Sequence, residues 1–336
     1  MTTFLHIAER KASPRVWIEA FVKELRALGD LTILENGAEM SEDERAARIR
    51  ECDVLFICWD TAPIPASVAA NPGRLQYVCN VTGQLRKYMP IAIIDAGVPV
   101  TNWGDAPSRP LAEGAMTLLL ACLKDLAGRA RIIRSEKWAP DEGLCSGRLD
   151  GLNVGVYGCG VTGRVFIELL RPFRPVIRVY DPYVRDLPEG CIAVATLDDL
   201  FSQSEAIVIH AGLTDETLHS VTAPLLAKLP RNGIVINTAR GAIIDQTALF
   251  AELESGRLRA GLDVLEPDRL PPGHPARHWD NLILTAHDLC KWRPLEGFPP
   301  ARMDTMHAVC LDNVRRFIQG EPLRFLMDRD RYERST

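Results

Sequence analysis

Three residues with reactive side chains follow short apolar runs in the second half of the chain: Arg240, Glu266 and His287. The planar guanidinium of an arginine matches a carboxylate with two parallel hydrogen bonds. An imidazole exchanges a proton near neutral pH, and a neighbouring carboxylate fixes its tautomer. Together these residue types are suited to binding an organic acid and moving a proton on it. The structural alternatives are an arginine paired with a surface acid, a glutamate in a turn, and a buried histidine whose hydrogen bonds are satisfied.

A glycine-rich turn lies between a strand candidate and a helix candidate. Gly158, Gly160 and Gly163 form the pattern Gly-x-Gly-x-x-Gly directly after the apolar run 152–157. In that context the first glycine permits a tight turn, the second lets the backbone approach a pyrophosphate, and the third lets the helix pack on the strand. Unpaired N–H groups at the start of the helix attract phosphate. The pattern predicts a dinucleotide site, and the alternative is a plain glycine turn.

An acidic residue ends the next strand candidate, 23 residues after Gly158. A carboxylate at this place, Asp181, accepts hydrogen bonds from the ribose hydroxyls of NAD and repels the 2′-phosphate of NADP. We therefore expect NAD rather than NADP, although Arg185 lies just beyond and weakens this preference. The alternative is a surface aspartate.

The rest of the chain supplies the elements that position these residues. Short apolar runs alternate with helix-like segments, which predicts parallel sheets with helices on both faces. The first series has helix candidates at residues 16–27 and 42–50 and strand candidates at residues 4–7, 31–34, 54–58, 77–80 and 99–102. The second series matches the doubly wound dinucleotide fold. Its strand candidates are residues 152–157, 176–180, 206–210, 233–237, 260–264 and 282–285.

A long apolar helix is predicted over residues 111–130, after a loop at 103–110. A last helix, over residues 301–319, is expected to pack back onto the first series. The predicted fold is therefore α/β, with two doubly wound parallel-sheet domains, the second a Rossmann NAD-binding domain. Residues 1–103 with 294–336 would form a discontinuous substrate-binding domain, and residues 104–293 the NAD-binding domain.

Five motifs in the same order closely resemble the D-isomer-specific 2-hydroxyacid dehydrogenase family, and the resemblance covers nearly the whole chain. They are the glycine motif with Asp181 and the stretches 210–217, 236–241, 261–267 and 284–287. The resemblance implies hydride transfer between NAD(H) and a small 2-hydroxy or 2-keto acid. By this resemblance Arg240 binds the carboxylate and polarises the carbonyl, His287 moves the proton, and Glu266 hydrogen-bonds His287.

The resemblance also implies a set of binding residues. Asp263 would accept from the nicotinamide carboxamide, and the loop 81–83 would hold the substrate carboxylate. The expected cofactor-binding residues are Gly158, Gly160, Val161, Thr162, Gly163, Asp181, His210, Thr238, Ala239, Arg240, Asp263 and His287. The expected substrate-binding residues are Thr82, Gly83, Arg240 and His287.

The chain departs from the family pattern where substrate binds. Residues 288–293 are bulkier than the small residues usual after the family's histidine, and Ala286 replaces the usual proline. In the loop after Thr82, Arg86 and Lys87 are either contacts for a second anionic group or a solvated surface pair. Trp103 and Trp292 are either pocket-lining or core residues. The identity of the acid therefore stays open. The alternative of a different class is an NAD(H)-sensing regulatory protein of the same fold without significant turnover.

Composition limits the partners and the cellular compartment that we expect for this protein. The chain has 336 residues and a formal net charge of -5, so no basic excess favours nucleic acid or a membrane surface as a partner. Nine cysteines without a Cys-x-x-Cys pair indicate reduced thiols and a cytoplasmic protein. His274 and His278 have the spacing of a helical metal pair, but the prolines around them predict a loop, so no metal site is expected. The long apolar helix favours a homodimer, as the family resemblance does.

Overall fold

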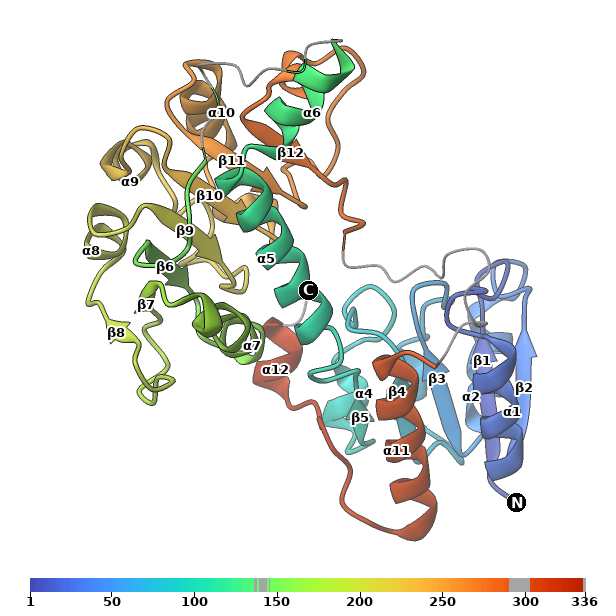
Figure 1. The fold of residues 1–336 in the computed structure, drawn as a ribbon. Coiled ribbons are helices and arrows are strands. Elements are labelled where there is room, and N and C mark those ends of the chain that lie inside the picture. The colour runs from blue at the N-terminus through green and yellow to red at the C-terminus, as the bar shows by residue number, and fades with distance from the viewer. Residues whose placement is uncertain (136–137, 139–143, 145, 290–302, 335–336) are drawn as a thin grey trace. The chain divides into compact units, whose positions relative to one another are not determined.

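The computed structural model describes residues 1–135, 138, 144, 146–289 and 303–334. These residues belong to two compact units, residues 1–107 with 292–336 and residues 108–291 (Figure 1). Each unit contains one parallel sheet with helices on both faces, so the predicted α/β class with two parallel-sheet domains is confirmed. The expected boundary at residues 293 and 294 lies outside the described residues.

The sheet of the first unit has five parallel strands in the order β2-β1-β3-β4-β5. In chain order the strands are β1 Thr3–Ile7, β2 Asp30–Leu34, β3 Val54–Ile57, β4 Tyr77–Asn80 and β5 Val100–Thr101. Every residue of β3 and of β4 is buried, as expected for central strands covered on both faces. Each predicted strand of this unit is confirmed to within one residue at either end.

Two helix layers cover this sheet. On one face α1 (Glu19–Leu28) and α11 (Thr305–Gln319) pack against side chains such as Phe4 and Phe56. The other face is covered by short helices, which are α2 Glu42–Arg50, α3 Ser67–Ala70, α4 Ala92–Asp95 and α12 Arg329–Arg334. The expected return of the last long helix to the first unit is confirmed, although residues 301–302 lie outside the description. The charged helix α12 gave no apolar signal and was not predicted.

The sheet of the second unit has seven parallel strands in the order β12-β11-β10-β9-β6-β7-β8. They are β6 Asn153–Tyr157, β7 Val176–Tyr180, β8 Ile192–Ala193, β9 Ala206–Ile209, β10 Ile234–Asn237, β11 Arg259–Leu262 and β12 Leu282–Leu284. Six of these were predicted. The edge strand β8 was not predicted: it has only two residues, both exposed, and the short apolar run 191–195 that contains it was not interpreted as a strand.

Helices cover both faces of the second sheet as well. One face carries α5 (Ser108–Leu123) and α7 (Val161–Leu170), which pack against each other and on the core around Val154. The other face carries α8 Leu197–Ser202, α9 Ala223–Lys228 and α10 Gln246–Glu254. Short 3-10 helices lie at Arg171–Phe173, Gly241–Ile243 and Pro275–His278.

The prediction of one long helix over residues 111–130 was wrong. The structure has α5 followed by α6 (Leu126–Arg134), and α5 begins inside the stretch expected to be a loop. The break falls at Asp125, whose φ is 51° and whose side chain is buried. Its carboxylate forms an ion pair with Arg259 of β11, with Nη2 2.5 Å from Oδ1. The helix ends where this buried pair fixes the chain, because an isolated buried charge is costly.

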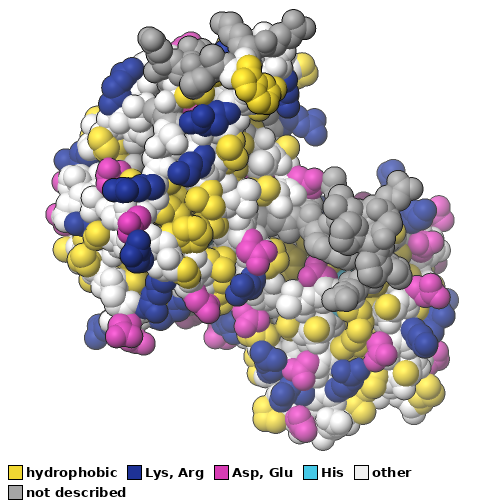
Figure 2. Space-filling view, in the orientation of Figure 1, with side chains coloured by type: hydrophobic (Ala, Val, Ile, Leu, Met, Phe, Trp, Pro, Cys, Tyr) yellow, Lys and Arg dark blue, Asp and Glu magenta, His cyan; other side chains and the backbone are white. Residues whose placement is uncertain are grey.

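The charged side chains and the cysteines can be described for part of the molecule. Basic and acidic side chains both lie on the face shown in Figure 2. The seven cysteines in the described segments are all free thiols. Among the helices that the structure describes, none has both the length and the apolar character needed to cross a membrane.

Candidate active site

The glycine turn connects β6 to α7 in the second unit. Gly158 has a φ of 94°, and a Cβ added there would collide with the backbone of Ala211. A Cβ at Gly163 would collide with the carbonyl oxygen of Gly158. A Cβ at Gly160 would meet nothing within 4 Å, and this N-cap residue leaves the helix start without a side-chain cap. The turn is therefore tightly packed at two glycines and open at the one expected to face phosphate.

Asp181 follows β7 and is tied to this turn. Its Oδ2 accepts from the backbone N–H of Cys159 at 2.7 Å, and its Oδ1 accepts from Tyr183 at 2.9 Å and Val184 at 3.2 Å. These bonds hold the carboxylate beside the glycine turn. A carboxylate has about four acceptor sites, so it retains capacity for a ribose hydroxyl.

Two polar atoms at the ends of β9 and β10 are buried without a hydrogen-bond partner among the described residues: Nε2 of His210 and Oγ1 of Thr238. Burial lowers the pKa of His210 to about 4, so the imidazole is neutral at neutral pH. Its ring packs on Phe166, with centroids 5.0 Å apart. Buried polar groups almost always have partners, so two orphans beside a glycine turn fit a site that a polar ligand completes. The residues present therefore fit a dinucleotide cofactor.

The other residues expected at the cofactor lie at the same edge of the sheet. Val161 is 57 % exposed at the start of α7, and Thr162 donates to Ser108 Oγ at 3.3 Å. After β10, the N–H of Ala239 donates to Asn237 Oδ1 at 3.0 Å. The structure places all of these residues within the second unit.

Arg240 follows β10 and is partly buried. Its Nη1 donates to Ala239 O at 2.7 Å, and its own carbonyl accepts from Asn237 Nδ2 at 2.8 Å. Burial lowers the pKa of the guanidinium, and the charge of Asp268 opposes this shift. A Cβ at Gly241 would collide with the backbone of Leu265, so the loop after β10 lies directly against the loop after β11.

Asp263 organises the segment that carries His287. Its buried Oδ1 accepts from Thr285 Oγ1 at 2.6 Å and from the N–H groups of Asp288 and Leu289 at 3.1 and 3.2 Å. The N–H of His287 donates to Asp263 O at 2.6 Å. Ala286 and His287 both have a φ of 56°, which is uncommon for residues other than glycine. Asp263 thus holds a tight turn after β12 that presents the imidazole.

The expected hydrogen bond between Glu266 and His287 is not the one that the structure shows. His287 Nδ1 contacts Asp268 Oδ2, whereas Glu266 Oε2 lies 2.6 Å from Nε2 of His219. The backbone of Glu266 is clamped by the side-chain amide of Gln246, with both hydrogen bonds at 2.9 Å. The clamp fixes where Glu266 points. Sequence reasoning therefore missed both Asp268 and His219, and the only signal was a second acid two residues after Glu266.

The loop expected to bind substrate follows β4 in the first unit. Thr82 is buried, and its N–H and hydroxyl both donate to Asn80 Oδ1 at 3.0 Å. A Cβ at Gly83 would lie 2.5 Å from the indole nitrogen of Trp103, so the tryptophan packs on this loop. The ring of Trp59 meets that of Trp103 edge-on at 5.8 Å. Trp103 is therefore a packing residue of the loop within the first unit.

The two basic residues of this loop are exposed, and each has a local contact. Arg86 donates to Tyr332 O at 3.3 Å, and the ammonium of Lys87 lies 5.1 Å from the centre of the Tyr88 ring. These contacts favour the surface-pair interpretation. Trp292 lies outside the described residues.

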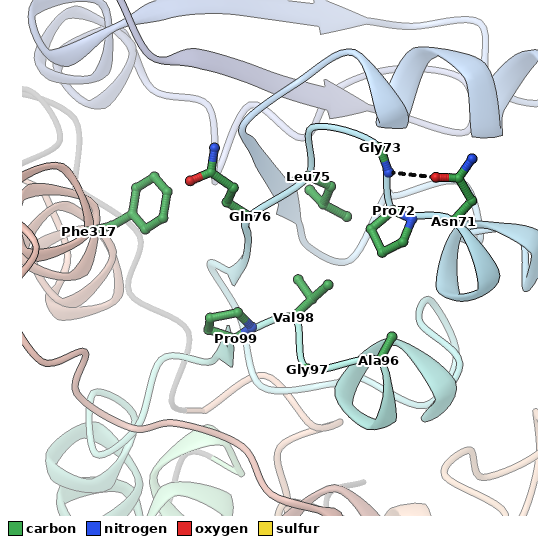
Figure 3. Close-up of a pocket in the computed structure, with 10 residues that line it drawn as sticks. All are labelled: Asn71, Pro72, Gly73, Leu75, Gln76, Ala96, Gly97, Val98, Pro99 and Phe317. Atoms are coloured by element: carbon green, nitrogen blue, oxygen red, sulfur yellow. Dashed lines mark hydrogen bonds between the residues drawn. The ribbon is translucent and has the colours of Figure 1, made fainter.

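A surface depression in the first unit lies away from this loop. It is lined by residues such as Leu75, Val98 and Phe317, which precede β4 and β5 or belong to α11 (Figure 3). It therefore sits at the amino ends of these strands, whereas Thr82 and Gly83 follow the carboxyl end of β4. Ligands of open parallel sheets bind at carboxyl ends, so we do not include this depression in the site.

The motifs of the second unit match a known domain. Residues 116–288 match the NAD-binding domain of D-isomer specific 2-hydroxyacid dehydrogenases. The chain belongs to the D-isomer specific 2-hydroxyacid dehydrogenase family. The expected resemblance is thereby confirmed. As a member of this family, the chain is an NAD(P)-dependent oxidoreductase of the class that acts on CH–OH donors.

Relatives of this dehydrogenase are similar over most of its length. A hydroxypyruvate reductase of Thermotoga maritima is 31% identical over 255 residues, which cover 74% of this chain and 81% of the relative. A hydroxypyruvate reductase of Blautia hydrogenotrophica is 26% identical over 309 residues, covering 90% and 93%. A D-isomer specific 2-hydroxyacid dehydrogenase from Xanthobacter autotrophicus Py2, solved with NADPH and MES, is 25% identical, covers 98% and 99%, and has a TM-score of 0.72.

Proposed function

We propose that this dehydrogenase transfers a hydride between NAD(H) and a small 2-keto or 2-hydroxy acid, with Arg240 binding the acid and His287 moving the proton. The observation that supports this most is the position of Arg240, Asp268 and His287, which follow the carboxyl ends of three adjacent strands, β10, β11 and β12. Asp268 contacts His287 and acts on Arg240 through its charge.

In reduction, the guanidinium of Arg240 neutralises the carboxylate of the keto acid and draws electron density toward the carbonyl oxygen. Of the two ring nitrogens of His287, Nδ1 has a hydrogen-bond partner among the described residues, which is Asp268, and Nε2 has none there. Nε2 is therefore the ring nitrogen from which a proton reaches the forming alkoxide, and the negative charge of Asp268 stabilises the imidazolium that supplies it. NAD(H), when bound, supplies the hydride or takes it up. In oxidation, Nε2 accepts the hydroxyl proton.

The proposed cofactor residues are those around the glycine turn. The N–H groups at the start of α7 would hold the pyrophosphate beside Gly160, and Asp181 would accept from the ribose. His210, Thr238 and Asp263 would contact the nicotinamide half. We propose NAD over NADP because a carboxylate repels a 2′-phosphate.

The proposal is tested by NADH oxidation with glyoxylate, hydroxypyruvate, pyruvate, phenylpyruvate and longer 2-keto acids, each repeated with NADPH. We expect turnover with at least one acid, faster with NADH.

Asp181→Ala should weaken NADH binding by about 10–100-fold, because a hydrogen bond to a charged group contributes about 1.5–3 kcal/mol. The same substitution should also reduce the ratio of the oxidation rate with NADH to the rate with NADPH. Asp186→Ala, in the same exposed loop, is the matched control. Tight NADH binding without turnover on any acid would favour the NAD(H)-sensing alternative.

Assembly is a separate part of the proposal: a homodimer, in the cytoplasm, where the thiols stay reduced. Leu126 and Ile133 lie seven residues apart on α6, so they share one helix face, and their side chains are 53 % and 52 % exposed. Trp138, shortly after α6, is 89 % exposed. Sedimentation should show a dimer at micromolar concentration, and Leu126→Glu with Ile133→Glu should dissociate it. Leu218→Glu, elsewhere on the second unit, is the control. A monomeric native enzyme contradicts this proposal.

A further inference from the structure

Three side chains of different chemistry meet at the carboxyl edge of the sheet in the first unit. His6 lies near the end of β1, and Cys58 and Asp60 follow β3. His6 Nε2 is 3.0 Å from Asp60 Oδ1, Cys58 Sγ is 2.9 Å from the same oxygen, and the sulfur and nitrogen are 3.9 Å apart. His6 and Cys58 are fully buried, while the Asp60 side chain is 15 % exposed. None of the three belongs to the proposed active site.

Each of these residues also forms a hydrogen bond with a backbone group or side chain outside the cluster. His6 Nδ1 lies 3.1 Å from the carbonyl oxygen of Phe56, which can only accept, so this nitrogen carries a proton. The second oxygen of Asp60 accepts from the N–H of Ser13, and the N–H of Cys58 donates to Thr61 Oγ1 at 2.7 Å. Metal-binding histidines commonly donate their other N–H to a carbonyl, and ligating carboxylates are themselves hydrogen-bonded. The surroundings of the cluster have this pattern.

The proton on Nδ1 has a consequence for the other ring nitrogen. In a neutral imidazole, Nε2 would then present its lone pair to the carboxylate oxygen of Asp60 at 3.0 Å, which is unfavourable. A positive charge between the two atoms, either a proton on Nε2 or a metal ion, removes this repulsion. The three donor atoms therefore surround a position that either a proton or a metal ion can occupy.

We propose that His6 Nε2, Cys58 Sγ and Asp60 Oδ1 bind one zinc ion. Thiolate and imidazole favour zinc over magnesium or calcium, which take oxygen ligands. The thiol S–H bond breaks, the sulfur binds zinc, and the proton leaves to solvent; any proton on Nε2 leaves in the same way.

The distances suit this ion after a small adjustment. Bond lengths of about 2.3 Å to sulfur and about 2.0–2.2 Å to nitrogen and oxygen place tetrahedral ligand atoms about 3.3–3.6 Å apart. The present separations run from 2.9 to 3.9 Å, so the atoms need to shift by only a few tenths of an ångström. Asp60 is the least buried of the three, so the ion enters on its side. Three protein ligands leave the fourth position to water or a small anion.

The test uses the full-length enzyme, stripped of metal by a chelator and titrated with Co²⁺. We expect one equivalent to produce the thiolate-to-cobalt charge-transfer band and the d–d bands of a tetrahedral site, and Zn²⁺ to abolish both. Cys58→Ser should lose the charge-transfer band. Asp60→Asn, at the least buried of the three positions, should lose stoichiometric binding without unfolding, as checked by circular dichroism.

Cys52→Ser is the matched control, because Cys52 is a buried thiol of the same unit outside the cluster; it should keep both bands. The proposal is overturned if the native enzyme gives no charge-transfer band, or if the band survives in Cys58→Ser. Isothermal titration with Zn²⁺ gives a second readout, and equal affinity of the native enzyme and Asp60→Asn also contradicts the site.

Discussion

Replacing His287 by glutamine is expected to lower kcat by ~10²–10⁴-fold, the usual contribution of a positioned proton-transfer group. Glutamine keeps much of the size of the side chain and its hydrogen bonding but carries no proton that titrates. NADH binding, followed by fluorescence, should persist because the glycine turn and Asp181 are untouched. Steady-state kinetics on the best acid of the panel give the measurement.

The matched control for this variant is His219→Gln. His219 is an imidazole of nearly equal exposure, at 52 % against 51 % for His287, and it too is paired with a carboxylate. The His219→Gln variant should leave kcat largely unchanged, since His219 has no role in the proposed chemistry. An unchanged kcat in His287→Gln, or an equal loss in both variants, would remove His287 from its proposed role.

The same kinetics distinguish the two carboxylates near this histidine. Asp268→Asn keeps the shape of the partner of His287 but removes the charge that stabilises the imidazolium, so kcat should fall. Glu266→Gln should cost less, because Glu266 contacts His219 in the structure. The opposite ranking would mean that Glu266 replaces Asp268 as the partner during turnover. If Asp268→Asn has the larger effect, Asp268 is a positioning residue that acts through His287 and Arg240.

The elements that were predicted correctly have a local cause. A buried strand of a parallel sheet needs only a short apolar run, and a phosphate-binding turn needs its glycines at fixed spacing. The features that were missed depend on partners far away in the sequence. The break between α5 and α6 is set by Asp125 and Arg259, which are 134 residues apart. The edge strand β8 has only two residues and pairs with β7 alone, so it is too short to be distinguished from a loop in the sequence.

The site residues also divide into those with a local signal in the sequence and those whose contacts depend on distant residues. The positions of Arg240 and His287 at strand ends were predictable from motif order, because parallel strands bring their carboxyl ends to one edge. Which carboxylate pairs with which histidine was not predictable, since it depends on the hydrogen bonds between the Gln246 side chain and the backbone of Glu266. The cluster of His6, Cys58 and Asp60 escaped notice for a related reason. Only the pairing of β1 with β3, which aligns His6 with Phe56, brings these residues together.

Replacing Arg240 by glutamine is expected to lower kcat/KM by ~10²–10⁴-fold, because two hydrogen bonds between charged groups contribute about 3–6 kcal/mol together. The loss should appear in both KM and kcat, since in the proposed role the guanidinium would bind the carboxylate in the ground state and the developing oxyanion in the transition state. The negative charge of Asp268 adds to the effect, because without Arg240 it repels the substrate anion directly.

Arg240→Lys separates charge from geometry. A lysine restores a positive charge without the planar pair of donors, so it should recover KM in part while kcat stays low. Arg269→Gln is the matched control: this arginine is exposed and adjoins Asp268 in the chain, so its removal changes the local charge equally without removing the guanidinium of Arg240. If Arg269→Gln and Arg240→Gln weaken the reaction to the same extent, the effect is one of net charge, and Arg240 does not bind the acid.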